Sequence, residues 1–291
     1  MVRCLVALAL ACGVSASGLG AQKMDRGIRL NADGSIRIYN SVGSVRVIGW
    51  NRDSLAVRGS LGEGNTLHFG GDPRGAKMFV EARDERNPAP VALEVMVPSK
   101  AKVWVKTVSA DIDVSGVTGS LDLYVVGGKI NVKGNPADIN AEAIDGPITI
   151  VGSPGWLRAK SASGDVTLNG SSSDVALSTV SGMITASGTA FEKAKFESVT
   201  GSIRFAGGFR PGGLANFDSH SGAIEIGLVT KMPADFDVVS IAGAISNKLT
   251  SSKPMKGRYG RGSELSTSHA GGGTRITVRS FKGPISLFRV E

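Results

Sequence analysis

The sequence predicts an all-β protein, a single-domain β-solenoid similar to a parallel β-helix, with about 18–21 residues in each coil. Three observations lead to this prediction. A glycine-centred turn recurs at a nearly constant spacing, the residues beside it alternate between apolar and polar, and no segment has the period of a long amphipathic helix. A unit this short cannot enclose a core of its own, so successive units must stack to bury their apolar rows.

The repeated turn defines a regular region over residues 103–247. Its turn residues follow one another at spacings of 18, 18, 18, 18, 19, 21 and 21. They are Ala110, Gly128, Gly146, Gly164, Gly182, Gly201, Gly222 and Gly243, and the pattern recurs at Gly43 and Gly283. Glycine at this corner is typical of a positive φ or of a close backbone approach between coils. Each unit is therefore expected to be a strand, a tight turn and a second strand.

The residues after each turn predict a half-buried strand. Two positions on, every unit has isoleucine or valine, and four positions on only Asn247 is polar. Polar side chains lie between, which gives the period of two expected of a strand with one buried face. The branched residues form one column in the stack: Val45, Ile112, Ile130, Ile148, Val166, Ile184, Ile203, Ile224, Ile245 and Ile285. We expect this column to be a continuous spine hidden from water.

One pair of columns before the turn departs from simple alternation. Two positions before the turn the side chains are mostly apolar, as in Val108, Ile144 and Phe281, and three positions before it they are mostly serine or threonine. Strict alternation would bury the hydroxyls and expose the apolar groups. We expect a bulge or corner that turns the apolar column inward. The alternative is an exposed apolar stripe, which would serve as a docking surface.

The first 21 residues are typical of a secretory signal peptide. Arg3 precedes an apolar stretch, Leu5 to Ala11, and small residues lead to a cleavage site after Ala21. The alternative is lipidation at Cys12. Because both cysteines, Cys4 and Cys12, lie in this segment, we expect a mature chain without disulfides, thiol catalysis or thiolate metal sites. The expected location is extracytoplasmic, periplasmic or secreted, with no transmembrane segment.

Residues 22–291 are predicted to be one domain. Irregular strands at Leu55–Arg58, Thr66–Phe69, Met78–Ala82 and Val91–Val97 interrupt the repeats within residues 27–102. We expect this part to cap the open end of the stack, since an exposed sheet edge invites polymerisation. Residues 248–273 are expected to be a basic, glycine-rich loop, and residues 274–291 a final coil that closes the C-terminal end.

The basic loop is the strongest candidate for a partner contact. Lys253, Lys256, Arg258, Tyr259 and Arg261 would bind an anionic lipid headgroup, an acidic glycan or nucleic acid; the alternative is a solvated, mobile loop. The net charge of +8 favours weak adhesion to anionic surfaces. Because the basic residues are spread along the chain, no specific nucleic-acid partner is expected. The oligomeric state is open.

The sequence offers one candidate acid–base pair. Glu197 and Asp218 each lie four residues before a turn, so they would be outward neighbours on adjacent coils. Two carboxylates this close can divide into an acid and a base, but the same column elsewhere is ordinary mixed surface. His68, His220 and His269 lack metal-ligand spacing. We expect no cofactor, no metal and no enzymatic activity.

Several units, among them DGSIRIYNSVGSVRVIGW, SGDVTLNG and ESVTGSIRF, resemble the DUF4097 family of adhesin-like β-strand-repeat proteins of the bacterial cell envelope. The ending GGGTRITVRSFKGPISL resembles that family's usual ending, and the likeness covers Ile28 to Val290. The resemblance implies a β-solenoid outside the cytoplasm and supplies no catalytic residues. The expected function is a non-enzymatic, adhesin-like scaffold that binds an envelope or surface partner. The alternatives are a carbohydrate-active β-helix enzyme with an acidic face and an envelope-stress sensing or regulatory protein.

Overall fold

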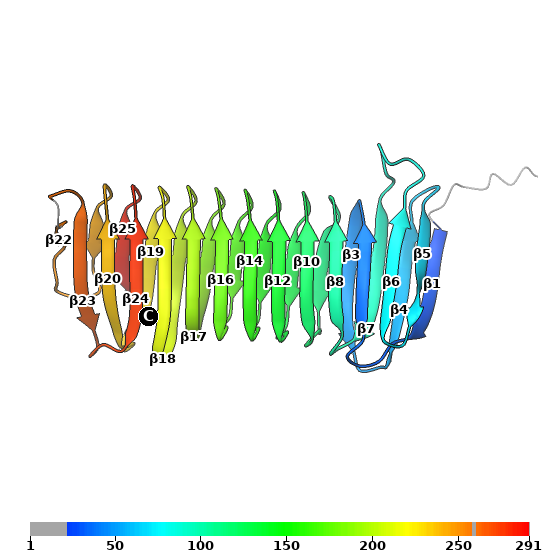
Figure 1. The fold of residues 1–291 in the computed structure, drawn as a ribbon, viewed down its shortest axis with the longest axis horizontal. Helices are drawn as coiled ribbons and strands as arrows, with labels where there is room; N and C mark the ends of the chain where they lie inside the picture. Colours follow the sequence, from blue (N-terminus) through cyan, green and yellow to red (C-terminus); the bar gives the residue numbers. More distant parts are fainter. Residues whose placement is uncertain (1–21, 258–259, 291) are drawn as a thin grey trace, which may run out of the picture.

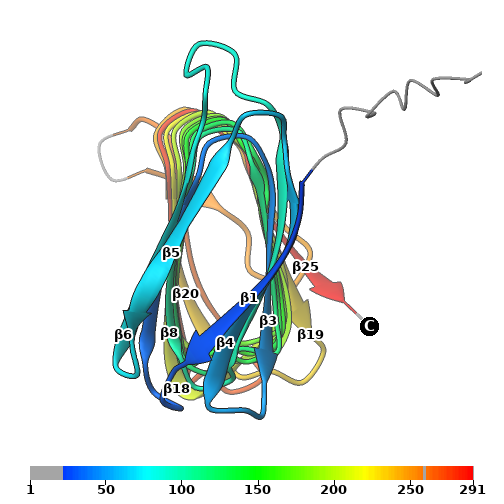
Figure 2. The same cartoon turned by 90° about the vertical axis from the view of Figure 1, so that its right-hand side faces the viewer.

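The structure, a computed structural model, describes residues 22–257 and 260–290, and these residues form 25 strands and no helix. All 25 strands belong to one hydrogen-bonded sheet. The sheet folds back on itself into two facing rows of strands and is nearly closed when viewed end-on (Figures 1 and 2). The all-β prediction is confirmed. The predicted signal peptide and Cys12 lie outside the described residues.

Each repeat places one strand in the first row, makes the glycine turn, and places the next strand in the second row. The first row contains β8 (Lys102–Thr107), β10 (Ser120–Val125), β12 (Asp138–Ala143), β14 (Trp156–Ser161) and β16 (Asp174–Thr179). The second row contains β9 (Asp111–Ser115), β11 (Ile130–Lys133), β13 (Ile148–Val151), β15 (Val166–Asn169) and β19 (Ile224–Val229). The long strands β17 (Ile184–Ser198) and β18 (Ile203–Ser219) belong to both rows, running from the second to the first.

Neighbouring repeats pair in parallel with equivalent positions aligned. Ile130 pairs with Ile148, Ile148 with Val166, Val166 with Ile184 and Ile184 with Ile203. All five side chains are at most 1% exposed. The predicted spine is therefore confirmed, and it supplies the apolar burial that a single repeat of this length lacks.

The turn glycines are needed for the close stacking of successive turns. Gly146, Gly164, Gly182, Gly201 and Gly222 all have φ values outside the left-handed region. A Cβ atom on any of them would overlap the backbone carbonyl group of the turn residue in the preceding repeat. Of the two roles considered for these glycines, close approach is the one the structure supports.

A cluster of aromatic rings lies in the interior where β17 and β18 run from one row to the other. Phe191, Phe196, Phe205, Phe209 and Phe217 gather there, with ring centroids 4.9–6.0 Å apart. Phe205 contacts the other four rings and is fully buried. The longer spacing of these repeats thus accommodates an aromatic core in place of the aliphatic one.

The C-terminal repeats do not stack in sequence order. In the first row, β18 pairs with β24 (Thr274–Ser280), and β24 pairs in turn with β20 (Ala234–Ser240). In the second row, β25 (Ile285–Val290) lies likewise between β19 and β21 (Ile245–Asn247). The prediction that the final coil closes the C-terminal end is therefore wrong. That coil is inserted one repeat inside the end, as the colours show in Figure 1.

Residues 248–273, expected to be a loop, contribute β22 (Met255–Lys256) and β23 (Ser263–His269). β23 pairs antiparallel with β20, so it covers the outer edge of the first row. Leu249 and Leu265 are buried, and the buried His269 ring has Nδ1 2.8 Å from the Met232 carbonyl oxygen. Leu265, Thr267 and His269 are buried at alternate positions of this strand, but only Leu265 is apolar, so the sequence carries little of the usual strand pattern here.

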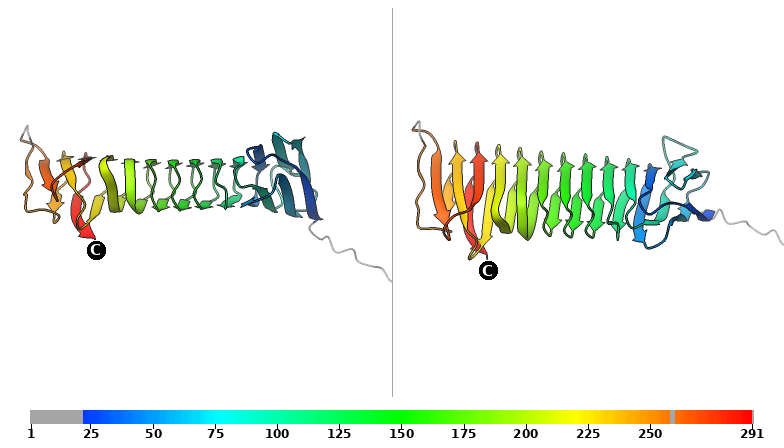
Figure 3. Two further views of the ribbon diagram at one scale, coloured as in Figure 1. Left: turned by 90° about the horizontal axis from the view of Figure 1, so that it is seen from below. Right: turned by 60° about the horizontal axis from the view of Figure 1, so that its bottom comes forward.

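The N-terminal strands lie at the opposite end of the molecule (Figure 3). They are β1 (Gln22–Arg29), β2 (Ser35–Asn40), β3 (Gly43–Trp50), β4 (Ser54–Leu61), β5 (Thr66–Asp72), β6 (Gly75–Glu81) and β7 (Val91–Pro98). β2 and β3 continue the two parallel rows. β1, β4 and β5 pair antiparallel with their neighbours. The four strands predicted in this region are all present.

Candidate binding surface at the turn edge

A stripe of exposed and half-buried, mostly apolar side chains runs along the edge where the first row enters its turns. Val108, Val180 and Val199 are 54%, 50% and 44% exposed, and Phe281 is 45% exposed. The expected inward bulge is therefore wrong, and the alternative of an exposed stripe is what the structure shows. In spatial order this turn-edge stripe consists of Val108, Val126, Ile144, Ala162, Val180, Val199, His220, Phe281 and Ile241.

The stripe faces outward because the hydroxyl column beside it has partners inside. The Ser161 hydroxyl donates to the Gly146 carbonyl oxygen at 3.0 Å and accepts the Gly164 N–H at 3.0 Å. Ser219 and Ser280 likewise donate to the carbonyl oxygens of Gly222 and Gly283. A buried hydroxyl is costly only when it lacks a hydrogen bond. Simple alternation therefore holds, and the turn backbone satisfies most of the buried hydroxyl groups, with Ser198 Oγ as an exception that is buried without a partner.

Two further columns of exposed and half-buried residues flank the stripe. The charged ladder lies on the strand side, four residues before each turn: Lys106, Tyr124, Glu142, Lys160, Ser178, Glu197, Asp218, Arg279 and Val239. The turn ladder lies on the other side, directly before each turn residue: Ser109, Gly127, Asp145, Ser163, Ser181, Thr200, Ser221, Lys282 and Ala242. Both columns follow the spatial order of the strands, so Arg279 and Lys282 precede Val239 and Ala242.

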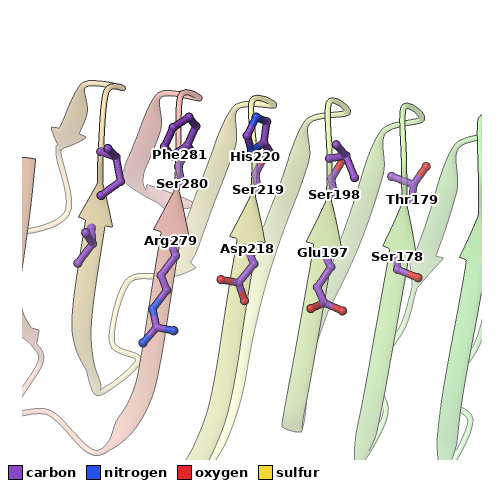
Figure 4. Close-up of a pocket in the computed structure, with 13 residues that line it drawn as sticks. Ser178, Thr179, Glu197, Ser198, Asp218, Ser219, His220, Arg279, Ser280 and Phe281 are labelled. Atoms are coloured by element: carbon purple, nitrogen blue, oxygen red, sulfur yellow. The ribbon is translucent and has the colours of Figure 1, made fainter. Parts of the chain in front are cut away.

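The stripe and the charged ladder border an open groove of about 530 Å³ over β16, β17, β18, β24 and β20. Figure 4 shows Glu197, Asp218 and Arg279 on three successive strands, below His220 and Phe281. Glu197 is paired directly with Asp218 across the strands, and Asp218 with Arg279. The predicted neighbourhood of the two carboxylates is confirmed. Sequence reasoning missed Arg279 because it placed the final coil, residues 274–291, at the C-terminal end of the stack.

Burial of Asp218 beside its neighbours changes its acidity. Desolvation raises the pKa of Asp218; Arg279 opposes this, Glu197 adds to it, and Lys195 opposes it. The Lys195 ammonium lies 2.7 Å from Glu197 Oε1, so these two side chains form an ion pair. The two carboxylates therefore have different environments, as an acid–base pair requires, although each is also close to a basic side chain.

The remaining candidate residues have structural partners or lie apart. His220 stacks on Phe281 with ring centroids 4.9 Å apart, and His68 lies 2.7 Å from Glu81 near the N-terminal end. Among the described residues, no three His, Cys, Asp or Glu side chains form a metal-binding group. The turn serines act in the turns themselves, as where the Ser163 hydroxyl donates to Asp145 Oδ1 at 3.0 Å.

The basic segment, which is the predicted loop of residues 248–273, has its described residues at the end of the rows opposite to β1 (Figure 3). Lys253, Lys256 and Arg261 are exposed, and Met255 beside them is 70% exposed. Arg258 and Tyr259 lie outside the described residues. The structure thus places three of the five predicted contact residues on the surface without testing what they bind. No helix in residues 22–257 and 260–290 has the length and apolar character needed to span a membrane.

Comparison with known proteins shows only distant structural likeness. No family model and no curated protein matches the chain. A candidate lipid binding protein from Parabacteroides distasonis is 15% identical, with a TM-score of 0.45 over 92% of this chain and 97% of that one. A candidate adhesin from Bacteroides fragilis is 12% identical, with a TM-score of 0.43 over 94% and 99% of the two chains. A candidate cell adhesion protein from Clostridium sporogenes is 6% identical, with a TM-score of 0.29 over 92% and 100%. At these values, the likeness carries no argument about function.

Proposed function

We propose that this protein is a non-enzymatic β-solenoid scaffold of the adhesin-like type, which works outside the cytoplasm and binds a partner along the turn-edge stripe. The exposure of that stripe carries the proposal. Exposed apolar groups normally lie scattered on a surface, whereas a continuous row of them marks a contact site. Because the row spans many stacked repeats, it suits an extended partner better than a small enclosed substrate.

The basic segment is a second contact of the proposed scaffold. Lys253 and Lys256 flank the exposed Met255, so cations and an apolar side chain project together from the end of the rows. That combination suits an anionic envelope surface, to which cations are attracted while an apolar group inserts. Arg258, Tyr259 and Arg261 complete the proposed contact set. The resemblance to the DUF4097 family and the signal-like first 21 residues support an extracytoplasmic location.

Binding measurements with two variants test this proposal. The chain from Gln22 onward would be screened on glycan and lipid arrays and against purified envelope fractions. We expect the chain to bind at least one component of these screens. Val180→Asp should weaken this binding if it occurs at the stripe, and the double variant Lys253→Glu with Lys256→Glu should weaken it if it occurs at the basic segment. Lys133→Glu, on the exposed face of β11, is the matched control. A chain that binds nothing, or that binds equally well in both variants, would refute the scaffold role.

The pairing of Glu197 with Asp218 and the raised pKa of Asp218 favour a carbohydrate-active enzyme as the second candidate. In that role, the carboxyl of Asp218 would act as general acid and that of Glu197 as the second carboxyl group of the pair. Asp218→Asn would then abolish cleavage of acidic or neutral polysaccharides. If the wild-type chain cleaves none of a broad polysaccharide panel, the second candidate is eliminated.

A further inference from the structure

We propose that the turn-edge stripe binds the same stripe of a second copy of this chain, with the two molecules antiparallel and the two-fold axis between the Val180 and Val199 rungs. This inference rests on the proposed function in one respect, since it takes the stripe as a contact surface. A two-fold interface uses the same patch on both subunits, so the patch must be complementary to a copy of itself that runs in the opposite direction. The three columns at the turn edge meet that requirement in size and charge.

In this antiparallel arrangement, the side chains of the two apolar columns are complementary in size. About the proposed axis, Val180 faces the partner's Val199, and Ala162, the smallest side chain of the stripe, faces the partner's His220. Ile144 faces the partner's Phe281. The large groups of one copy thus meet the small or medium groups of the other. Val180, Val199 and Phe281 are all about half exposed in the single chain, so their burial would drive association.

In the same arrangement, facing residues of the two charged columns are complementary in the sign of their charge. In the charged ladder, Glu142 faces the partner's Arg279, Lys160 faces the partner's Asp218, and Ser178 faces the partner's Glu197. In the turn ladder, Asp145 faces the partner's Lys282. The two-fold axis makes every one of these pairs occur twice. Each of these four pairs is opposite in charge or combines a carboxylate with a hydroxyl donor, which is the complementarity that fixes register in protein interfaces.

Neighbouring registers are disfavoured by like charges. A shift of the partner by one rung brings Glu142 against the partner's Asp218 and keeps one kind of opposite-charge pair, Lys160 with the partner's Glu197, so it has fewer favourable pairs than the proposed register. The opposite shift brings Lys160 against the partner's Arg279 and Glu197 against the partner's Glu197. A parallel arrangement would set the charged ladder of one copy against the turn ladder of the other. Glu142 would then face the partner's Asp145, and Arg279 the partner's Lys282. Repulsion of this kind excludes wrong pairings even where the correct pairing is weak.

The inserted coil creates this match. If the strands stacked in sequence order, Val239 and Ala242 would occupy the rung opposite Glu142 and Asp145. Insertion of β24 between β18 and β20 places Arg279 and Lys282 there instead. The same insertion brings Phe281 beside His220, with ring centroids 4.9 Å apart. The unusual strand order therefore supplies both the cations and the largest apolar group of the proposed interface.

The interface would be modest in size. Seven steps of about 4.8 Å separate the Val126 and Ile241 rungs, which gives a contact about 34 Å long. A strip of that length and three side chains wide buries about 1,000 Å² in total, near the lower limit for specific association. We therefore expect a reversible dimer with a dissociation constant in the micromolar range.

Sedimentation velocity over micromolar to millimolar concentrations tests the association, with the chain that starts at Gln22. We expect the wild type to dimerise, and Val180→Asp and Glu142→Lys each to weaken dimerisation at least tenfold. Adding Arg279→Glu to Glu142→Lys restores the opposite charges and should restore the dimer. Lys133→Glu, on the other row, should leave dimerisation unchanged, and circular dichroism would verify that every variant is folded.

Cysteine cross-linking tests the register. The sequence has cysteine only at positions 4 and 12, so the chain from Gln22 contains none. We expect a mixture of Val180→Cys and Val199→Cys chains to form a disulfide-linked heterodimer faster than either chain forms a homodimer. Equal rates would overturn the antiparallel register. A wild type that stays monomeric, or a charge reversal that the second substitution does not rescue, would overturn the dimer itself.

The two proposals fail in different ways. If the chain is monomeric but Val180→Asp removes binding to an array component, the scaffold function stands and the dimer is refuted. If Val180→Asp changes neither association nor array binding, the stripe is not a contact surface. The dimer is then refuted, and the scaffold would depend on the basic segment alone.

Discussion

Replacing a turn glycine by alanine tests the close stacking of the repeats. In the Gly164→Ala variant, the new Cβ would overlap the Gly146 carbonyl oxygen, so the two turns must separate. Their separation would break three of the hydrogen bonds at these turns: the two made by the Ser161 hydroxyl and the bond from Ser163 N–H to the Ile144 carbonyl oxygen, each 3.0 Å long. At about 1 kcal/mol per bond, their loss costs about 3 kcal/mol.

The unfolded chain offsets part of this cost. Alanine has fewer unfolded conformations than glycine, which returns about 0.4–1 kcal/mol. We therefore expect Gly164→Ala to lower the free energy of unfolding by about 2–3 kcal/mol. For a chain of this size, that corresponds to a Tm about 5–10 °C lower.

Thermal and urea unfolding, followed by circular dichroism, would measure the effect. Gly127→Ala is the matched control, because it lies in an equivalent turn but its new Cβ would meet only the Val108 carbonyl oxygen, at 4.0 Å. The control should stay within about 1 kcal/mol of the wild type. If both variants unfold together with the wild type, the glycine column is not held by stacking and the reasoning is refuted.

Four other residues of the structure lead to expected outcomes, for Ser161, Phe205, Asp218 and Asp235. Ser161→Ala should lower the free energy of unfolding in urea by about 1–3 kcal/mol, because the buried Ser161 hydroxyl has two hydrogen-bond partners. Ser198→Ala should leave it nearly unchanged, because Ser198 Oγ is buried without a partner. Equal losses in the two variants would contradict this assignment. Phe205→Ala should cost about 3–5 kcal/mol, since four aromatic rings surround it, and a Tm unchanged in calorimetry would disprove that packing. Desolvation raises the pKa of Asp218, so the contribution of this residue to the free energy of unfolding falls as pH rises through that pKa. Asp218→Asn should therefore be more stable than the wild type above that pKa, but not at acidic pH. Hydrogen bonds from Ser268 Oγ and Gly273 N–H lower the pKa of Asp235, so its contribution is lost as pH falls, and carboxyl NMR titration should show the two opposite shifts.

The spine and the repeat were predictable because they depend on local pattern. Ile130, Ile148 and Val166 recur at one spacing, and parallel stacking is the arrangement that buries them all in register. The strands at residues 54–61 and 91–98 also follow from apolar content between turn residues. These features involve neighbours in sequence or exact repeats, and the sequence encodes both directly.

The strand order and the stripe could not be predicted from pattern alone. Val239 and Arg279 lie in equivalent repeats, so either could follow Asp218, and the choice depends on how the whole end of the stack packs. The stripe was misjudged because burying Ser161 was taken to be unfavourable. Its hydrogen bonds to Gly146 and Gly164 belong to the turn geometry, which becomes visible only in three dimensions.

The insertion of β24 and β25 also constrains the order of assembly. During synthesis the chain emerges from its N-terminal side, so β8 to β19 can add to the growing stack one strand after another. β20 and β21 cannot form their final parallel pairs when they are synthesised, because the strands with which they pair, β24 and β25, are translated later. About forty residues of chain must therefore wait unpaired, or pair temporarily with the wrong neighbour. Growth of the stack is consequently sequential over most of its length and concerted at its last step.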